Sequence, residues 1–211
     1  MTNSTAKTAP NTTETVLVLD FGAQYGQLIA RRVRDLKVYS EIVPCDTPAE
    51  EIAAKKPAAL ILSGGPASVY AEDAPSVDPG VFELGIPVLG FCYGQQIMAT
   101  TLGGSVGHTE KGEYGPAPLT RCDGTDGVPA SALLGDTPAE QTVWMSHRDA
   151  VSEVPEGFVV TSKTDVCPVS SMECAERKLY ATQFHPEVKH SEYGNQMLSN
   201  FLFNICGLAA D

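Results

Sequence analysis

The stretch Val88-Leu89-Gly90-Phe91-Cys92-Tyr93-Gly94 decides how the first half of the chain is interpreted. Its first four residues are apolar or glycine, as expected of a buried strand, and a helical pattern follows from Tyr93 to about Leu102. A cysteine between two glycines at a strand-to-helix junction is the cysteine form of the nucleophile elbow. We therefore expect a sharp turn that lifts the Cys92 side chain clear of a sheet.

The same strand-then-helix pattern precedes this stretch. Apolar strands are predicted at residues 16–19, 41–43 and 59–62, and helices at about 24–36 and from Thr47, with Thr47 as N-cap and Pro48 at the first helical position. Short apolar strands separated by helices indicate an α/β fold with a mostly parallel central sheet and helices on both faces. Ligands bind such sheets beyond the carboxyl ends of the strands, which is where Asp20, Gly64 and Cys92 fall.

The second half has a different pattern. Between Gly103 and Gly135 glycine and proline are frequent, and no element is predicted there. Strands at 141–145, 158–161, 169–174 and 179–184 predict an antiparallel extension of the sheet, and a helix at about 193–206 closes the chain, with Gly207 as C-cap. No repeat or linker divides the chain, so we expect one domain, residues 15–208, after a disordered tail, residues 1–14.

Composition narrows the classes of function. The net charge of -12 argues against a nucleic-acid partner, because an acidic surface repels phosphates. No apolar run approaches the ~18 residues of a membrane span, and the first residues lack the apolar core of a signal peptide. We therefore expect no membrane partner and a cytoplasmic location.

The cysteines form no C-x-x-C pair, which predicts free thiols and no metal site. Structural roles are expected for five of them: Cys45, Cys122, Cys167, Cys174 and Cys206.

Cys92 is the candidate nucleophile, and an acid–base partner is predicted for it. The helix that begins at Tyr93 directs its free N–H groups toward the sulfur and favours the thiolate. His185 and Glu187 occur together in Gln183-Phe184-His185-Pro186-Glu187, after an apolar strand. An ordinary surface pair explains His-Pro-Glu alone equally well. Together with the elbow, the His-Pro-Glu motif favours a Cys-His-Glu triad, in which the carboxylate of Glu187 orients the imidazole of His185.

Acyl chemistry also needs donors for an oxyanion. The backbone N–H of Tyr93, directly after the nucleophile, is one candidate, and the turn Gly64-Gly65-Pro66 at the end of a neighbouring strand supplies another. The chain contains no G-x-x-x-x-G-K-[ST] sequence, so no Walker-type nucleotide site is predicted.

The elbow, the Gly-Gly-Pro turn and the late His-Pro-Glu, in this order, resemble the class I (triad) glutamine amidotransferases over residues 16–207. Within that family the chain is most similar to the glutaminase domains of GMP synthetases, through residues 19–25, 63–70, 91–96, 144–147 and 183–188. It departs from the family at Arg148, where glycine is common, and at Ala181-Thr182.

The resemblance implies a flavodoxin-like class I amidotransferase fold and the hydrolysis of L-glutamine to glutamate and ammonia. Cys92 would form a thioester, His185 would transfer protons, and Glu187 would orient His185. Gly65 and Tyr93 would bind the oxyanion. The resemblance assigns glutamine binding to four further residues: Gly64, Gln96, Ser146 and His147.

The resemblance also implies a partner. In GMP synthetases the ammonia aminates xanthosine monophosphate on an ATP pyrophosphatase domain, which uses ATP and magnesium; this chain lacks its S-G-G-V-D-S loop. We therefore expect no cofactor in this domain, and either a part of a longer protein or a separate subunit. The alternatives are the glutaminase of another class I amidotransferase, a cysteine peptidase-like or redox-type relative, and a regulatory module with an inactive triad. The presence of every triad residue argues against the last.

Overall fold

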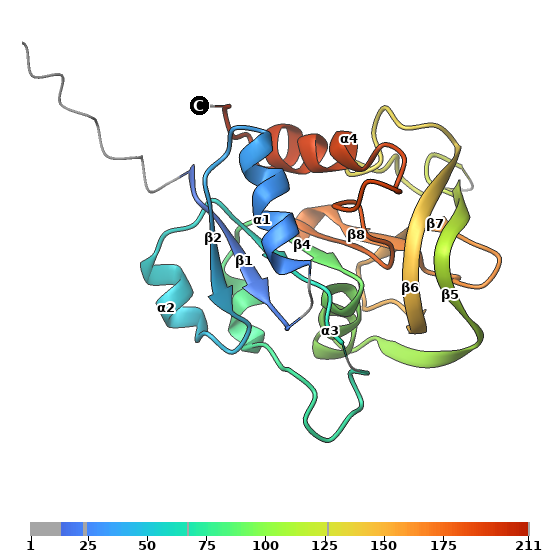
Figure 1. Cartoon of the computed structure of the whole chain (residues 1–211), viewed down its shortest axis with the longest axis horizontal. Helices are drawn as coiled ribbons and strands as arrows, with labels where there is room; N and C mark the ends of the chain where they lie inside the picture. Colours follow the sequence, from blue (N-terminus) through green and yellow to red (C-terminus); the bar gives the residue numbers. More distant parts are fainter. Residues whose placement is uncertain (1–13, 23–24, 67, 126, 211) are drawn as a thin grey trace, which may run out of the picture.

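The computed structural model describes residues 14–22, 25–66, 68–125 and 127–210, and within them nine strands form one sheet in the order β2-β1-β3-β4-β9-β8-β7-β5-β6 (Figure 1). The predicted tail, residues 1–14, lies outside the described residues except for Glu14. No helix in the described ranges is long and apolar enough to cross a membrane.

Five neighbouring strands run parallel: β2 (Ser40–Pro44), β1 (Val16–Asp20), β3 (Ala59–Leu62), β4 (Val88–Phe91) and β9 (Leu179–Thr182). The order 2-1-3-4, completed by a fifth parallel strand, is that of flavodoxin-like sheets. The predicted α/β class and parallel sheet are confirmed. Because β4 and β9 are parallel neighbours, the residues after Phe91 and after Thr182 emerge at the same edge of the sheet.

Helices cover both faces of the parallel sheet, as predicted. Helix α1 (Gly26–Asp35) and helix α4 (Gly194–Ser199) lie on one face, while α2 (Ala49–Ala54), the 3-10 helix η2 (Pro79–Glu83) and α3 (Tyr93–Thr101) lie on the other (Figure 1). Side chains of β1 alternate accordingly, so that Val16 and Val18 join one buried cluster and Leu17 and Leu19 join the other.

The second half adds four antiparallel strands, β5 (Ser105–Arg121), β6 (Glu140–Glu153), β7 (Val159–Lys163) and β8 (Ser171–Cys174). The antiparallel extension is confirmed. Strand β9 ends at Thr182, so that Gln183 and Phe184, predicted to lie within the strand, follow it instead.

Strand β5 was not predicted. Glycine and proline weaken strand propensity, but β5 is the longest strand described because it pairs with β6 along most of its length. The pairing is interrupted between His108 and Glu113, opposite Arg148, and this irregular segment lies beside the site described below.

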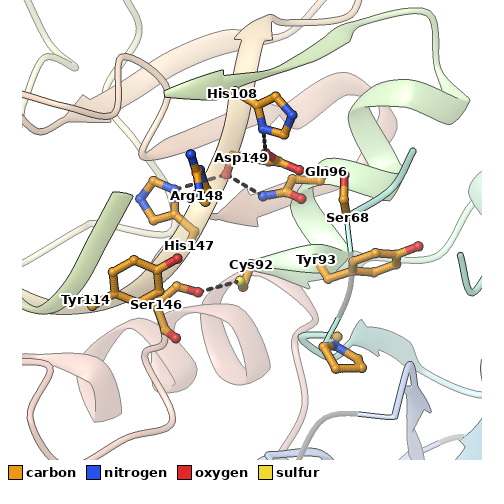
Figure 2. A pocket seen from close by; sticks show the side chains of 12 residues that line it. Ser68, Cys92, Tyr93, Gln96, His108, Tyr114, Ser146, His147, Arg148 and Asp149 are labelled. Atoms are coloured by element: carbon orange, nitrogen blue, oxygen red, sulfur yellow. Dashed lines mark hydrogen bonds and ion pairs between the residues drawn. The ribbon is translucent and has the colours of Figure 1, made fainter. Parts of the chain in front are cut away.

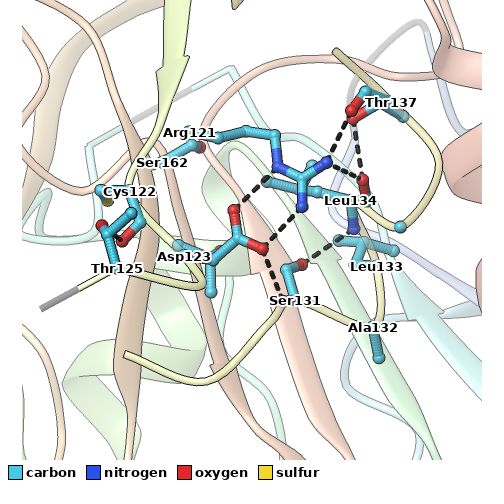
Figure 3. Close-up of polar contacts among 12 residues, drawn as sticks. Arg121, Cys122, Asp123, Thr125, Ser131, Ala132, Leu133, Leu134, Thr137 and Ser162 are labelled. Atoms are coloured by element: carbon cyan, nitrogen blue, oxygen red, sulfur yellow. Dashed lines mark hydrogen bonds and ion pairs between the residues drawn. The ribbon is translucent and has the colours of Figure 1, made fainter. Parts of the chain in front are cut away.

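The loop after β5 is held by Arg121 at the end of that strand. Its guanidinium donates to both carboxylate oxygens of Asp123, at 2.8 and 2.6 Å, and to the carbonyls of Leu134 and Thr137, at 2.7 and 2.6 Å (Figure 3). Asp123 in turn accepts from the backbone N–H of Ser131, at 2.7 Å. A planar guanidinium satisfies these acceptors together, which fixes the loop against the sheet.

Helix ends differ from prediction at α2. Thr47 does not cap this helix, because its hydroxyl donates to the carbonyl of Pro44, at 2.7 Å, and Pro48 occupies the cap position. The backbone N–H of Ala49 is instead bound by Asp78, 29 residues later. Helix α1 begins at Gly26, whereas the predicted start at Gln24 lies outside the described residues.

The closing helix contains a π-helical second half. Helix α4 continues as η4 (Asn200–Ile205), and Gly207 follows with a φ of +68°, as expected of a glycine C-cap. The predicted helix is thus confirmed in extent, but its last turns are wider than those of an α-helix.

Candidate active site

Cys92 lies on a sharp turn between β4 and α3, with φ of 52° and ψ of −106°, a conformation that is strained for any residue with a side chain. The flanking glycines are required for close packing. A Cβ atom added at Gly90 would lie 2.6 Å from the carbonyl oxygen of Gly94, and one at Gly94 would lie 2.5 Å from that of Leu62. The predicted elbow is confirmed, and its two glycines are explained by space.

The elbow brings Cys92 beside His185, whose imidazole Nδ1 pairs with the Glu187 carboxylate at 2.8 Å. The two meet because β4 and β9 are neighbours, and the backbone N–H of Cys92 donates to the carbonyl of Thr182 at 2.8 Å. His185 and Glu187 are buried, at 2% and 0% exposure, whereas Cys92 keeps 7%. Of these three residues, Cys92 lines the cavity described below, and His185 and Glu187 do not.

Two opposed effects act on the pKa of His185. Burial lowers it, but the carboxylate of Glu187 and the nearby Cys92 sulfur, as thiolate, raise it and prevail, so that the pKa of His185 lies well above its usual value. Nε2 of His185 is buried and has no hydrogen-bond partner among the described residues. With Nδ1 held by Glu187, Nε2 is the nitrogen left to exchange a proton at the sulfur.

A cavity of about 380 Å³ opens over Cys92. Figure 2 shows the sulfur between Tyr93 on one side and Ser146 and Tyr114 on the other. The volume and the mixed polar lining fit a small polar ligand. The residues that line it are Gly65, Pro66, Ser68, Cys92, Tyr93, Gln96, His108, Tyr114, Ser146, His147, Arg148 and Asp149.

The residues predicted to bind an oxyanion lie together. Gly65 packs so closely on Tyr93 that an added Cβ would lie 2.9 Å from the ring carbon Cγ. Both residues line the cavity, whereas Gly64 is buried and does not line it. The carbonyl of Gly64 accepts from the Ser63 hydroxyl at 2.9 Å, which fixes the turn.

Three of the four residues predicted to hold glutamine line the cavity, namely Gln96, Ser146 and His147, whereas the fourth, Gly64, does not. The carbonyl oxygen of Ser146 accepts from the Cys92 thiol at 3.7 Å. Nε2 of Gln96 donates to the Asp149 carbonyl at 2.7 Å, so its amide nitrogen already has a protein partner. Nδ1 of His147 lies 3.0 Å from the same carbonyl and therefore carries a proton, since a carbonyl can only accept.

Several residues at the site were missed from the sequence, among them Tyr114 and Asp149 of the cavity wall and two residues that contact site side chains, Glu113 and Gln183. Glu113 on β5 is paired with His147 on β6, and its carboxylate lies 2.9 Å from Nε2 of that ring. Gln183 directly follows β9, and its Nε2 lies 3.5 Å from the Cys92 sulfur. The only signal for Gln183 was its place in the His-Pro-Glu segment, and nothing in the sequence pointed to Glu113.

Ligand atoms of Glu113, His147 and Cys167 lie within 4.8 Å of one another. The second oxygen of Glu113 accepts from the Thr164 hydroxyl at 2.7 Å, and the Cys167 thiol donates to the carbonyl of Val169 at 3.4 Å. Burial raises the pKa of Cys167 to about 12, which keeps it a thiol, whereas metals bind the thiolate. These contacts favour a structural cluster that orients His147.

The remaining cysteines have settings unlike that of Cys92. All six thiols are free. Burial raises the pKa of Cys45, Cys122 and Cys206, the last to about 12, and Cys174 is buried. These thiols are poor nucleophiles at neutral pH.

Comparison with known proteins decides the family. The sequence model of the class I glutamine amidotransferases matches residues 17–205. The chain belongs to the class I glutamine amidotransferase family. Among curated members of the family, GMP synthase [glutamine-hydrolyzing] of Streptomyces coelicolor is 56% identical over 208 residues, which cover 99% of this chain and 39% of that protein.

Solved structures of other proteins share this fold. A protein from Thermoplasma acidophilum, described as a putative GMP synthase subunit, has a TM-score of 0.81 and 31% identity, covering 92% of this chain and 94% of that one. A glutamine amidotransferase from Thermotoga maritima, at a TM-score of 0.70 and 18% identity, covers 93% of this chain and 99% of that one and shares the fold. The chain spans about two fifths of the length of the curated relatives it matches.

Proposed function

We propose that this chain hydrolyses the side-chain amide of L-glutamine to glutamate and ammonia. The observation that supports this most is the position of Cys92, on a strained elbow at the end of β4, beside the His185–Glu187 pair that follows the adjacent parallel strand. A nucleophile, a proton carrier and an orienting carboxylate are the parts that covalent acyl transfer requires.

The proposed reaction has two steps. The sulfur of Cys92 attacks the amide carbon, and His185 gives its proton to the departing nitrogen, so that ammonia leaves and a thioester remains. His185 then takes a proton from water, and the resulting hydroxide attacks the thioester. The carbon–sulfur bond breaks, glutamate leaves, and the Cys92 thiolate and the protonated His185 are restored. The raised pKa of His185 favours the imidazolium, which is the form needed to protonate the leaving group.

Charge on the amide oxygen develops during both steps. We assign its stabilisation to the backbone N–H groups of Gly65 and Tyr93, since these two residues lie together at the wall of the cavity. Loss of one such donor typically costs about 10²–10³ in rate.

The α-amino and α-carboxylate groups of the substrate glutamine would lie against residues 146–148 of β6. The carbonyl of Ser146 supplies an acceptor there, and Oε1 of Gln96 is the amide atom left for a ligand. Both ring nitrogens of His147 are held by protein partners, so this side chain would shape the wall against which glutamine lies. Gly64 would act indirectly by fixing the turn that carries Gly65. Arg148, exposed at the cavity, adds a positive charge where glycine is common in the family.

We further propose that the ammonia serves a synthetase portion that makes GMP from xanthosine monophosphate with ATP and magnesium. The support is the high identity to proteins named GMP synthase [glutamine-hydrolyzing], of which this chain matches about two fifths. The chemistry assigned to this chain uses its own side chains alone. Six free thiols fit a reducing compartment, and we place the protein in the cytoplasm.

The test is ammonia release from glutamine by the protein and two variants. We expect slow release that Cys92→Ala reduces by at least about 10³-fold. The matched control is Cys122→Ala, since Cys122 is half-buried and lies outside the cavity, and its activity should equal that of the unaltered protein. Release that persists in Cys92→Ala, or cleavage of peptides in place of glutamine, would refute the proposal.

A further inference from the structure

The Cys92 sulfur has a second polar neighbour besides His185. Nε2 of Gln183 lies 3.5 Å from Sγ, and Gln183 is completely buried. The contact is possible because Gln183 directly follows β9, the parallel neighbour of the strand that ends at the elbow. A buried amide that points at a nucleophile can change its charge state.

The orientation of this amide is fixed by its neighbours. Nε2 of Gln96 donates to the backbone carbonyl of Asp149, at 2.7 Å, and a carbonyl cannot donate. The same Nε2 donates to Oε1 of Gln183, at 3.0 Å. The oxygen of Gln183 is therefore turned to Gln96 and its nitrogen to the sulfur. The reverse orientation would set two NH₂ groups against each other.

We propose that Gln183 is a further catalytic residue, whose side-chain amide donates a hydrogen bond to the Cys92 sulfur and stabilises the thiolate. This inference rests on the proposed function, in which Cys92 is the nucleophile. A hydrogen bond to an ion is about twice as strong as one between neutral groups, so this donor favours the thiolate over the thiol.

The neighbouring Ser146 carbonyl explains why such a donor is needed. This oxygen, 3.7 Å from Sγ, can accept only from the neutral thiol and lies unfavourably close to a negative sulfur. Gln183 offsets that contact. Other titratable or charged groups also face the sulfur or its cavity, and all of them are present in both the unaltered protein and the Gln183 variants: His185 with Glu187, Cys167, Tyr93, His108, Tyr114, His147, Arg148 and Asp149.

The test is the pH dependence of Cys92 alkylation by iodoacetamide, followed at this residue by peptide mass spectrometry. Replacement of Gln183 by methionine keeps the shape and removes the donor, and we expect the pH midpoint of alkylation to rise by about one unit. The matched control is Gln95→Met. Gln95 is also completely buried, but it donates to the Val169 carbonyl, at 3.1 Å, and its variant should keep the wild-type midpoint.

A second variant covers the case in which Gln183→Met does not fold. Gln183→Glu keeps the shape and the oxygen that accepts from Gln96 but sets a carboxylate against the sulfur, so its midpoint should rise further. An unchanged midpoint in either Gln183 variant, or an equal rise in Gln95→Met, would overturn the inference.

Turnover of glutamine separates this inference from the proposed function. We expect Gln183→Met to lower kcat about tenfold with little change in KM, because the contact is to the reacting sulfur. If the unaltered protein released no ammonia from glutamine while Gln183→Met still raised the midpoint, the Gln183 contact would be supported and the proposed function overturned.

Discussion

Glu187 is the residue on which the charge of the triad depends most. Glu187 is completely buried. Its carboxylate oxygen Oε1 pairs with Nδ1 of His185, and its other oxygen, Oε2, has no hydrogen-bond partner among the described residues. A buried carboxylate of this kind is stable only beside a positive charge. The raised pKa of His185 follows from this pairing, against the opposing effect of burial.

We expect Glu187→Gln to lower kcat by about 10²–10⁴, because the imidazolium loses its counter-charge. The raised pKa of His185 means that its proton is present at low pH and is lost only as the pH rises through that raised value. The variant lowers this pKa, so the alkaline fall in activity should move to lower pH. The measurement is a pH–rate profile for ammonia release.

The control for this variant is Glu176→Gln, which changes an exposed glutamate in the turn after β8. Its profile should equal that of the unaltered protein. An alkaline limb that does not move in Glu187→Gln would show that this carboxylate does not set the charge of His185.

The sequence predicted the triad residues because they lie in local motifs, the elbow and His-Pro-Glu, whereas the contacts of Gln183 and Glu113 have no local signal. His185 and Glu187 are separated by one residue, so their pairing can be read locally. Gln183 meets Cys92 across 91 residues, and Glu113 meets His147 across 34. Such contacts appear only when the strands are placed in register.

At the scale of elements, the junction of β4 and α3 determines the site. Helix α3 packs so closely on β3 that Gly94 leaves no room for a side chain against the Leu62 carbonyl. We expect Gly94→Ala to cost about 1–3 kcal/mol of unfolding free energy and to reduce activity, because the elbow must shift. Urea denaturation and the ammonia assay measure the two effects.

Gly107→Ala provides the comparison. The nearest atom to an added Cβ there is Oγ of Ser152, at 3.9 Å, and the φ of Gly107 is not positive. This variant should change stability by less than about 0.5 kcal/mol. Equal losses in the two variants would mean that close packing at the elbow is not what requires glycine.

Elements defined by local pattern were predictable, and those defined by pairing were not. The strands of the parallel sheet are short apolar runs between helices, so their burial is visible in the sequence. Strand β5 contains glycine, proline and charged residues and exists because β6 pairs with it. The prediction that Thr47 caps α2 was wrong for a related reason. The backbone N–H of Ala49 donates instead to the side chain of Asp78, which lies 29 residues later in the chain.

At the scale of the whole molecule, two cores on opposite faces of the sheet hold the site at its edge. The closing helix belongs to one of them, in which Phe201 is completely buried and its ring lies 6.3 Å from that of Tyr180 on β9. Packing of this helix thus supports the strand that leads to His185.

Phe201→Ala is expected to lower the free energy of unfolding by about 3–5 kcal/mol, because it leaves a cavity against β9. Phe203→Ala, in the same helix but only half-buried, should cost clearly less. Thermal or urea unfolding measures both. Losses of similar size would indicate that the helix does not pack on the sheet through Phe201.

The central claim is that Cys92 forms a covalent intermediate with glutamine, and rapid acid quenching during turnover tests it most directly. Intact-protein and peptide mass spectrometry of the quenched sample should show a mass increase of one glutamyl group, located on Cys92. The modification should be absent from Cys92→Ala and present in Cys122→Ala. A glutamyl group found on another residue, or ammonia released with no acylated protein at any quench time, would contradict the account.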